Sequence, residues 1–109
     1  MRVADVCASF QAAVVDVLTG KTISAAKKLK LNKIVVGGGV SANSALRAKF
    51  MSEGRKNGIK VYLPSKKFCT DNAAMVASLG YYKFKKGMDG RAPASQTRVD
   101  PSLPIKNWP

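Results

Sequence analysis

Apolar side chains recur at helical spacing through the first thirty residues. They return every three or four positions from Val3 to Leu18 and resume after Gly20, which predicts one amphipathic helix over about residues 2–29. We expect this helix to be a packing element that buries one stripe. The stripe assigned to the core by this spacing comprises Val3, Val6, Cys7, Phe10, Val14, Val17, Leu18, Ile23, Ala26 and Leu29.

Two short strands are predicted next, separated by a helix. Residues 33–36 form a β-branched run that stops at three consecutive glycines, which is typical of a buried strand entering a tight turn. Helical spacing then extends from Ala42 to Glu53, with Ser41 or Asn43 as the N-cap, and residues 54–58 are expected to end the helix. Residues 59–63 alternate as a second strand that stops at Pro64.

The remaining residues predict a loop, a helix and an extended tail. Residues 65–69 form the loop, Thr70 and Asp71 occupy N-cap positions, and the helix over 73–86 ends at Gly87. The tail contains every proline but Pro64, and we expect it to dock through Leu103, Ile105 and Trp108. The order α-β-α-β-α predicts an α/β lobe over residues 1–87 with parallel strands, followed by the tail over 88–109. Because a parallel sheet normally has more strands and two covered faces, we expect this lobe to belong to a larger assembly or protein.

Composition narrows the classes of function. The 109 residues are 46% apolar, enough for one small domain, and 19 basic against 6 acidic residues give a net charge of +13. This surplus attracts polyanions such as nucleic acid or nucleotides, although a basic surface complemented by another chain explains it equally well. The absence of His and the wide separation of the two Cys exclude a zinc finger, a Ser-His-Asp triad and a Cys-His pair within the chain. Since no unbroken apolar run is long enough to span a bilayer and no secretory signal is present, we expect a cytoplasmic protein without a membrane helix.

The glycine turn is the first candidate site. Gly37, Gly38 and Gly39 follow a strand, so a ligand can approach the backbone there, and the next helix offers unpaired amides and the positive end of its dipole. This arrangement suits a nucleotide, but it matches neither GxGxxG nor a Walker A sequence, and a tight turn explains it equally well. Asn43 is placed either to hydrogen-bond a ribose or base edge or simply to cap the helix.

The loop around Asp71 is the second candidate site. A carboxylate that follows a parallel strand is where α/β proteins often hold a metal or phosphate, although helix capping is the more common role for such a residue. One carboxylate cannot hold a catalytic metal alone. Cys69 is a candidate reactive thiol, with a buried structural Cys as the more common alternative.

Several segments together resemble one family. The stretches VVGGGVSANSALRAKF and FCTDNAAMVA, with VADVCASFQAAVVDVL before them and DPSLPIKNWP after them, are similar to the C-terminal part of the tRNA threonylcarbamoyladenosine transferase family, long described as O-sialoglycoprotein endopeptidases. The resemblance covers nearly the whole chain. It implies that the chain is about the last third of an actin-like, sugar-kinase-like ATPase fold. It also implies an enzyme that transfers threonylcarbamoyl from its adenylate to N6 of the adenosine beside the anticodon.

The resemblance also implies roles for the candidate residues. Asn43, Gly37, Gly38 and Gly39 fall on positions that bind ATP or the threonylcarbamoyl-adenylate, and Asp71 falls on a ligand of an iron or zinc ion that acts as a Lewis acid. The family's other metal ligands are two histidines in an HxxxH element, and this chain has no His. We therefore expect no complete catalytic site within this chain and no activity from it in isolation.

The resemblance and the basic surface also predict binding partners, and two alternative functions stay open. The resemblance implies tRNA, and in bacteria a paralogous actin-like subunit and a small P-loop ATPase, as partners; self-association through uncovered apolar faces is also expected. The lysines expected to meet tRNA phosphates are Lys66, Lys67, Lys83, Lys85 and Lys86. A stand-alone basic nucleotide- or RNA-binding module is one alternative, but it needs exposed aromatic residues. A metalloendopeptidase is the other, although the chain has no HExxH sequence.

Overall fold

The computed structural model describes residues 2–88 and residue 102, and it confirms the predicted order of helices and strands. The chain forms two compact units, residues 1–73 and 74–109. The predicted division at residues 87 and 88 stays a prediction, and the predicted anchors Leu103, Ile105 and Trp108 lie outside the described residues. The elements are α1 (Val3–Lys28), β1 (Lys33–Val35), the 3-10 helix η1 (Gly39–Ala42), α2 (Ser44–Lys56), β2 (Lys60–Tyr62), the 3-10 helix η2 (Lys66–Phe68) and α3 (Ala73–Lys85).

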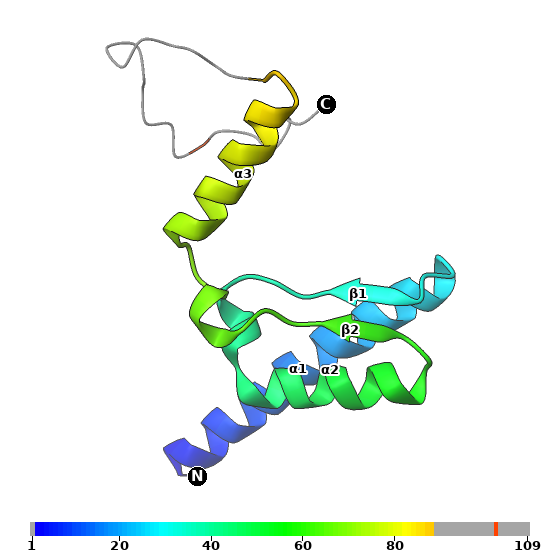
Figure 1. Ribbon diagram of the computed structural model, residues 1–109. Helices are drawn as coiled ribbons and strands as arrows, with labels where there is room; N and C mark the ends of the chain where they lie inside the picture. The colour runs from blue at the N-terminus through cyan, green and yellow to red at the C-terminus, as the bar shows by residue number, and fades with distance from the viewer. Residues whose placement is uncertain (1, 89–101, 103–109) are drawn as a thin grey trace. The chain divides into compact units, whose positions relative to one another are not determined.

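The first unit is built on two parallel strands. β1 pairs with β2 so that Ile34 lies opposite Val61, which confirms the predicted parallel pair. The chain runs along α1, returns along β1, runs out along α2 and returns along β2 (Figure 1). Both strands therefore end at the same edge of the sheet. This topology brings the glycine turn after β1 close to the loop after β2.

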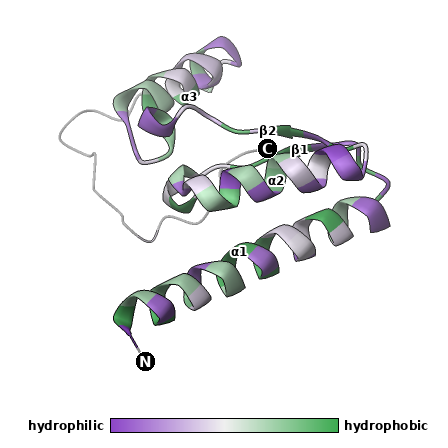
Figure 2. Ribbon diagram, turned by 90° about the horizontal axis from the view of Figure 1, so that it is seen from below, coloured by the Kyte–Doolittle hydropathy of each residue, from purple (hydrophilic) through white to green (hydrophobic). Residues whose placement is uncertain are grey.

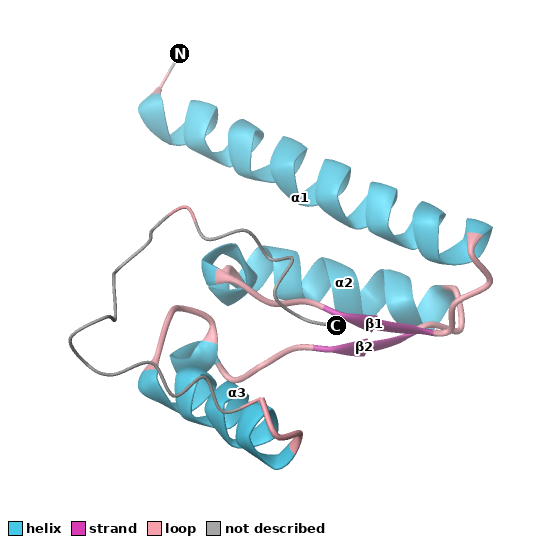
Figure 3. Cartoon of the chain, turned by 90° about the horizontal axis from the view of Figure 1, so that it is seen from above, coloured by secondary structure: helices cyan, strands magenta, loops and turns pink. Residues whose placement is uncertain are grey.

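One face of the sheet is covered by α1 and α2, as the arrangement in Figure 3 shows. On the opposite face, within the described residues of the first unit, no helix covers the strands, and Val35 there is 80% exposed. A sheet with one bare face agrees with the expectation that this lobe needs a further covering layer. Two clusters form the core, one of Ile23, Ala26, Ile34 and Ile59 and the other of Val15, Leu46 and Phe50, with Val36 and Val61 packed against them.

The predicted core stripe of α1 is wrong over much of its length. A helix of 26 residues is about 39 Å long, whereas α2 has 13 residues and reaches only about half as far. The strongly apolar positions in the N-terminal half of α1, green in Figure 2, therefore remain exposed in the described structure. Ile23 and Ala26 are buried as predicted, and Val15 and Thr19 are buried although they were not assigned to the stripe. The residues predicted as buried but found exposed are Val3, Val6, Cys7, Phe10, Val17, Leu18 and Leu29.

The length and composition of α1 also bear on the membrane. By these two criteria α1 is long and apolar enough to cross a bilayer. The lack of a long unbroken apolar run therefore does not exclude a membrane helix, and the expectation of a chain without one stays a prediction. That expectation counted unbroken apolar runs. The few polar residues of α1 interrupt these runs, but the mean hydropathy of the helix stays high because apolar residues, including many alanines, outnumber them. Buried core helices and signal sequences near an N-terminus meet the same criteria. Only 11% of the most apolar stretch of α1 is buried, although Ile23 and Ala26 pack in the core.

The bounds of α2 differ from the prediction at both ends. Ala42, predicted as helical, belongs to η1, and α2 continues through Gly54 to Lys56. Gly54 is buried inside the helix and does not end it. A Cβ there would lie 2.6 Å from Cγ2 of Val61 and 2.8 Å from the carbonyl oxygen of Ile59. The glycine therefore permits close packing between α2 and the strand that follows it.

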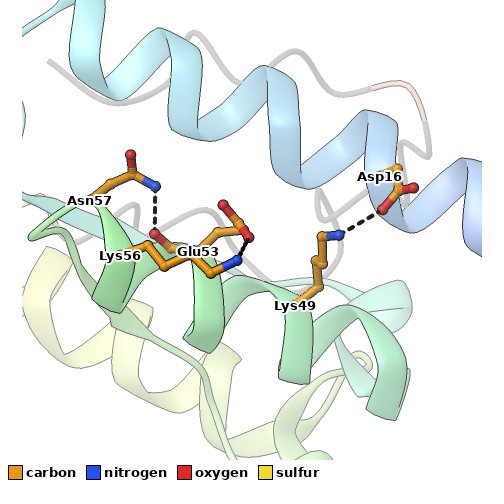
Figure 4. A network of polar contacts seen from close by, with 5 residues as sticks. All are labelled: Asp16, Lys49, Glu53, Lys56 and Asn57. Carbon is orange, nitrogen blue, oxygen red and sulfur yellow. Dashed lines mark hydrogen bonds and ion pairs between the residues drawn. The ribbon is translucent and has the colours of Figure 1, made fainter.

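A polar network joins the exposed side of α2 to its surroundings (Figure 4). Lys49 pairs with Asp16 of α1 at 3.1 Å, and Lys56 pairs with Oε1 of Glu53 at 2.9 Å. Asn57 closes the helix end by donating from Nδ2 to the carbonyl oxygen of Glu53 at 2.7 Å. The hydrogen bond from Lys56 lowers the pKa of Glu53 below its ordinary value, and this effect exceeds the opposing effect of desolvation.

The lowered pKa of Glu53 predicts a pH dependence. A carboxyl group with a depressed folded-state pKa stabilises the fold above its unfolded-state pKa, and this contribution is lost as pH falls through the folded-state value. We therefore expect Glu53→Gln to lower the melting temperature slightly at pH 7 and to leave it unchanged in acid below the folded-state pKa. Thermal unfolding of both proteins between pH 3 and pH 7 measures this difference. An equal difference at every pH would show that the carboxylate charge has no part in it.

Candidate functional site

Two loops at one edge of the sheet hold the predicted site residues. The glycine turn follows β1, and the segment of residues 63–72 follows β2. They lie close together, since a Cβ added at Gly39 would lie 3.8 Å from Cγ2 of Thr70. The structure thus brings together the two stretches that were predicted separately as candidate sites.

The glycine turn is closed by Ser41. Gly38 has a φ of +89°, and its carbonyl oxygen accepts hydrogen bonds from the backbone N–H of Ser41 at 2.9 Å and from its Oγ at 2.6 Å. Ser41 is 1% exposed. The positive φ explains the glycine at position 38, whereas Gly37 and Gly39 have no positive φ. Those two glycines leave the backbone open on the exposed side of the turn.

A recess of about 290 Å³ opens beside the turn. Leu18 and Thr22 of α1 form one wall, and Val36, Gly37 and Val40 form the other. Apolar side chains therefore lie next to an accessible stretch of backbone amides. Such a site can accept a flat apolar ring and hydrogen-bond the polar groups attached to it.

Asn43 caps α2, which confirms one of its two predicted roles. Its Oδ1 accepts from the backbone N–H of Leu46 at 3.0 Å, and its Nδ2 donates to Oε1 of Gln11 at 2.9 Å. Ser41, the other predicted cap, instead closes the glycine turn. Nδ2 has a second N–H that a ligand can bind, and a ligand that uses the first must displace Gln11, which is exposed. The binding role of Asn43 stays a prediction.

Asp71 is exposed and lies two residues before α3 begins at Ala73. The residue directly before the helix is Asn72, whose Nδ2 donates to the carbonyl oxygen of Thr70 at 2.9 Å. The predicted N-cap at Thr70 or Asp71 is therefore one or two residues too early. Across the described residues, no group of three or more His, Cys, Asp or Glu gathers around Asp71 or elsewhere. One carboxylate alone does not fit an iron or zinc ion, so a metal there needs ligands from outside the described part of this chain.

Arg47 links the two loops and was not singled out from the sequence. Its guanidinium donates to the carbonyl oxygens of Ser41 at 2.9 Å and Pro64 at 2.7 Å and lies 3.8 Å from Sγ of Cys69. Cys69 is 3% exposed, which favours the structural role over the reactive one. The one available signal for Arg47 was its position four residues after Asn43, where it lies on the same side of α2 as the cap.

The predicted tRNA-binding lysines do not all lie in one unit. Lys66 donates to Oγ of Ser44 at 2.9 Å, and Lys67 lies 4.9 Å from the ring centroid of Phe68. Both belong to the first unit, whereas Lys83, Lys85 and Lys86 belong to the second. Their contact with tRNA stays a prediction.

Comparison with known proteins gives a consistent result. A family model described as tRNA N6-adenosine threonylcarbamoyltransferase matches residues 1–78. A relative of that name from Endomicrobium trichonymphae is 49% identical over 95% of this chain and 30% of its own length. Relatives of the same name from Thermosipho africanus and Clostridium perfringens are each 55% identical over 77% of this chain, covering 26% and 25% of their own lengths. The chain thus spans between a quarter and a third of the length of these relatives.

Proposed function

This chain belongs to the tRNA N6-adenosine threonylcarbamoyltransferase family, and we propose on that basis that it forms one part of the active site of such a transferase. The family is a group of tRNA-modifying enzymes. In our proposal the described α/β unit is the C-terminal part of an actin-like ATPase fold. The complete enzyme transfers threonylcarbamoyl from its adenylate to N6 of the adenosine beside the anticodon.

The observation that carries the proposal is the meeting of the two loops at the carboxyl edge of the parallel sheet. Ligands of open α/β folds bind outside the carboxyl ends of the strands. Here the glycine turn, the start of α2 and the segment leading to Asp71 all lie at that edge. The loops are also held in contact by Arg47.

The proposed work of these residues is binding and orientation. The exposed amides of Gly37 to Gly39 and the amide group of Asn43 hold the adenosine part of ATP or of the threonylcarbamoyl-adenylate, with the adenine ring in the apolar recess. Fixing the adenylate relative to the tRNA amine lowers the entropy cost of their reaction. Asp71 supplies one carboxylate to an iron or zinc ion whose remaining ligands come from outside this chain.

The surroundings of the site are part of the same proposal. We infer that tRNA phosphates meet the basic surface, that the complete enzyme works in the cytoplasm, and that a paralogous actin-like subunit and a small P-loop ATPase assist it in bacteria. Exposed apolar positions such as Phe10, which is 71% exposed, favour association of the isolated chain with itself.

A second candidate function is nucleic-acid binding by this chain alone. Tyr62 and Phe68 are 41% and 43% exposed, and each has a lysine close to its ring, with Lys60 at 5.1 Å and Lys67 at 4.9 Å from the centroids. Exposed rings beside cations are the groups that stack on bases and neutralise phosphates. Salt-sensitive RNA binding that does not depend on nucleotide would favour this function.

A fusion enzyme tests the first proposal. In it, this chain replaces the matching segment of the Thermosipho africanus relative, and tRNA threonylcarbamoylation is measured with the adenylate as donor. We expect the fusion enzyme to be active and the isolated chain to be inactive. An inactive fusion enzyme that is folded, or an active isolated chain, would contradict the proposal.

Variants of Asn43 separate binding from capping. Asn43→Asp keeps an acceptor for the N–H of Leu46 but loses the donor, so we expect a stability within about 0.5 kcal/mol of the parent together with a KM for the adenylate raised about 10-fold or more. Asn43→Ala also loses the cap and should cost about 1 kcal/mol of stability. An unchanged KM in Asn43→Asp would leave Asn43 with the capping role alone.

A further inference from the structure

We propose that Arg47 is a positioning residue that sets the glycine turn at a fixed distance from the loop leading to Asp71. The inference rests on the proposed function, because it concerns the alignment of the two parts of the same site. It assigns a task to a residue that touches neither the proposed nucleotide nor the proposed metal. The task follows from three contacts of one side chain.

The contacts of Arg47 reach both loops at once. Nη1 donates to the carbonyl oxygen of Ser41 in η1, and Nη2 donates to the carbonyl oxygen of Pro64, two residues after the end of β2. Nη1 also approaches Sγ of Cys69, which in turn lies 3.6 Å from the carbonyl oxygen of Ser65. The half-buried guanidinium is therefore a bridge whose two ends are backbone atoms of different loops.

Arginine suits this bridge better than lysine. The planar guanidinium holds its donors in a fixed fork, so two acceptors bound to it are held at a fixed separation. An ammonium group is a single point with rotating donors and imposes no such separation. The hydrogen bonds between β1 and β2 do not fix the distance between the two loops, because β1 ends at Val35 and β2 at Tyr62, before either loop begins.

Each end of the bridge is tied to a residue of the proposed site. The carbonyl of Ser41 belongs to the turn that Ser41 itself closes onto Gly38. Pro64 lies two residues before η2, and Cys69 follows η2 directly, two residues before Asp71. Arg47 therefore helps to set the separation between the nucleotide-binding turn and the proposed metal ligand, beside the hydrogen bond from Lys66 to Ser44. A misplacement of about 1 Å can cost about 100-fold in rate.

Amide chemical shifts of this chain test the bridge directly. Two-dimensional 15N NMR compares the parent with Arg47→Ala and Arg47→Lys, and with Arg55→Ala as the matched control, since Arg55 is an exposed arginine on the same helix. We expect both Arg47 variants to shift the amides of residues 37–43 and 65–71, and the control to shift only residues near position 55. Shifts confined to α2, or parent-like shifts in Arg47→Lys, would overturn the inference.

Kinetics of the fusion enzyme supply the second measurement. We expect Arg47→Lys to lower kcat at least about 10-fold while KM for the adenylate changes less than about 3-fold, because the turn keeps its own contacts. A purely structural role would lower the yield of folded enzyme and leave kcat per folded molecule unchanged, and that result overturns the inference. An inactive parent fusion enzyme would instead contradict the proposed function, while the amide shifts still decide whether Arg47 joins the loops.

Discussion

Replacing Asp71 by Ala is expected to lower threonylcarbamoylation by the fusion enzyme at least about 100-fold. Loss of a residue that only orients a metal ligand lowers activity by up to about 100-fold, and loss of the ligand itself should lower it at least as far. Asp71 is exposed and is expected to contribute little to folding, so the melting temperature should stay close to that of the parent. The measurements are the initial rate, the metal content after gel filtration and the melting temperature.

Two further variants make the Asp71 result specific. Asp71→Asn keeps the size of the side chain and loses its charge, so we expect metal content and rate to fall nearly as far as in Asp71→Ala. Asp5→Ala removes another exposed carboxylate, at the start of α1 where it pairs with Arg2 at 3.7 Å, and should leave both unchanged. Full metal content and full rate in Asp71→Ala would remove Asp71 from the set of ligands.

Local patterns predicted the elements of this fold well. Periodicity placed α1 within one residue of its observed ends, and the glycine at position 87, with a φ of +70°, follows the last helix as expected. The alternation of helices and strands was sufficient to predict the parallel pair. These features depend on neighbours within a few positions, which is the range over which a sequence pattern carries information.

The burial of individual side chains was predicted less well, because it depends on which other element packs against each part of a helix. The spacing of apolar residues showed that α1 has an apolar stripe, but not that α2 and the short strands reach only part of it. Gly54 was interpreted as a helix end because glycine is common there. Gly54 instead permits Ile59 and Val61 to pack closely against α2. The spacing of apolar residues within the helix gives no information about this contact.

The candidate site shows the same division. The cap formed by Asn43 was predicted from its position. The two loops were predicted as separate candidate sites, and their meeting is a consequence of the parallel pairing that the structure shows. The partner of Asn43 on α1, Gln11, and the bridging role of Arg47 were not predicted. Arg47 donates to the backbone carbonyls of Ser41 and Pro64. Because every residue type has a backbone carbonyl, the sequence does not identify these two acceptors, and the position of Arg47 four residues after Asn43 indicates only the side of α2 on which it lies.

Replacing Gly54 by Ala is expected to destabilise this chain by about 2–3 kcal/mol. The new Cβ would lie 2.6 Å from Cγ2 of Val61 and 2.8 Å from the carbonyl oxygen of Ile59. The valine can rotate at a cost, but the carbonyl belongs to the backbone that leads into β2 and accommodates the methyl group only if α2 and β2 move apart. Denaturant unfolding monitored by circular dichroism measures the loss.

Gly20→Ala is the matched control, since Gly20 also lies inside a helix but a Cβ there meets nothing within 4 Å. Alanine is favoured over glycine in a helix interior by about 1 kcal/mol, so Gly20→Ala should stabilise the chain by about that amount. The same gain is contained in Gly54→Ala, and the difference between the two variants therefore isolates the steric effect of the contact between α2 and β2, at about 3–4 kcal/mol. Equal effects of the two substitutions would mean that α2 does not approach β2 closely in solution, and the edge at which the two candidate loops meet would then lose its support.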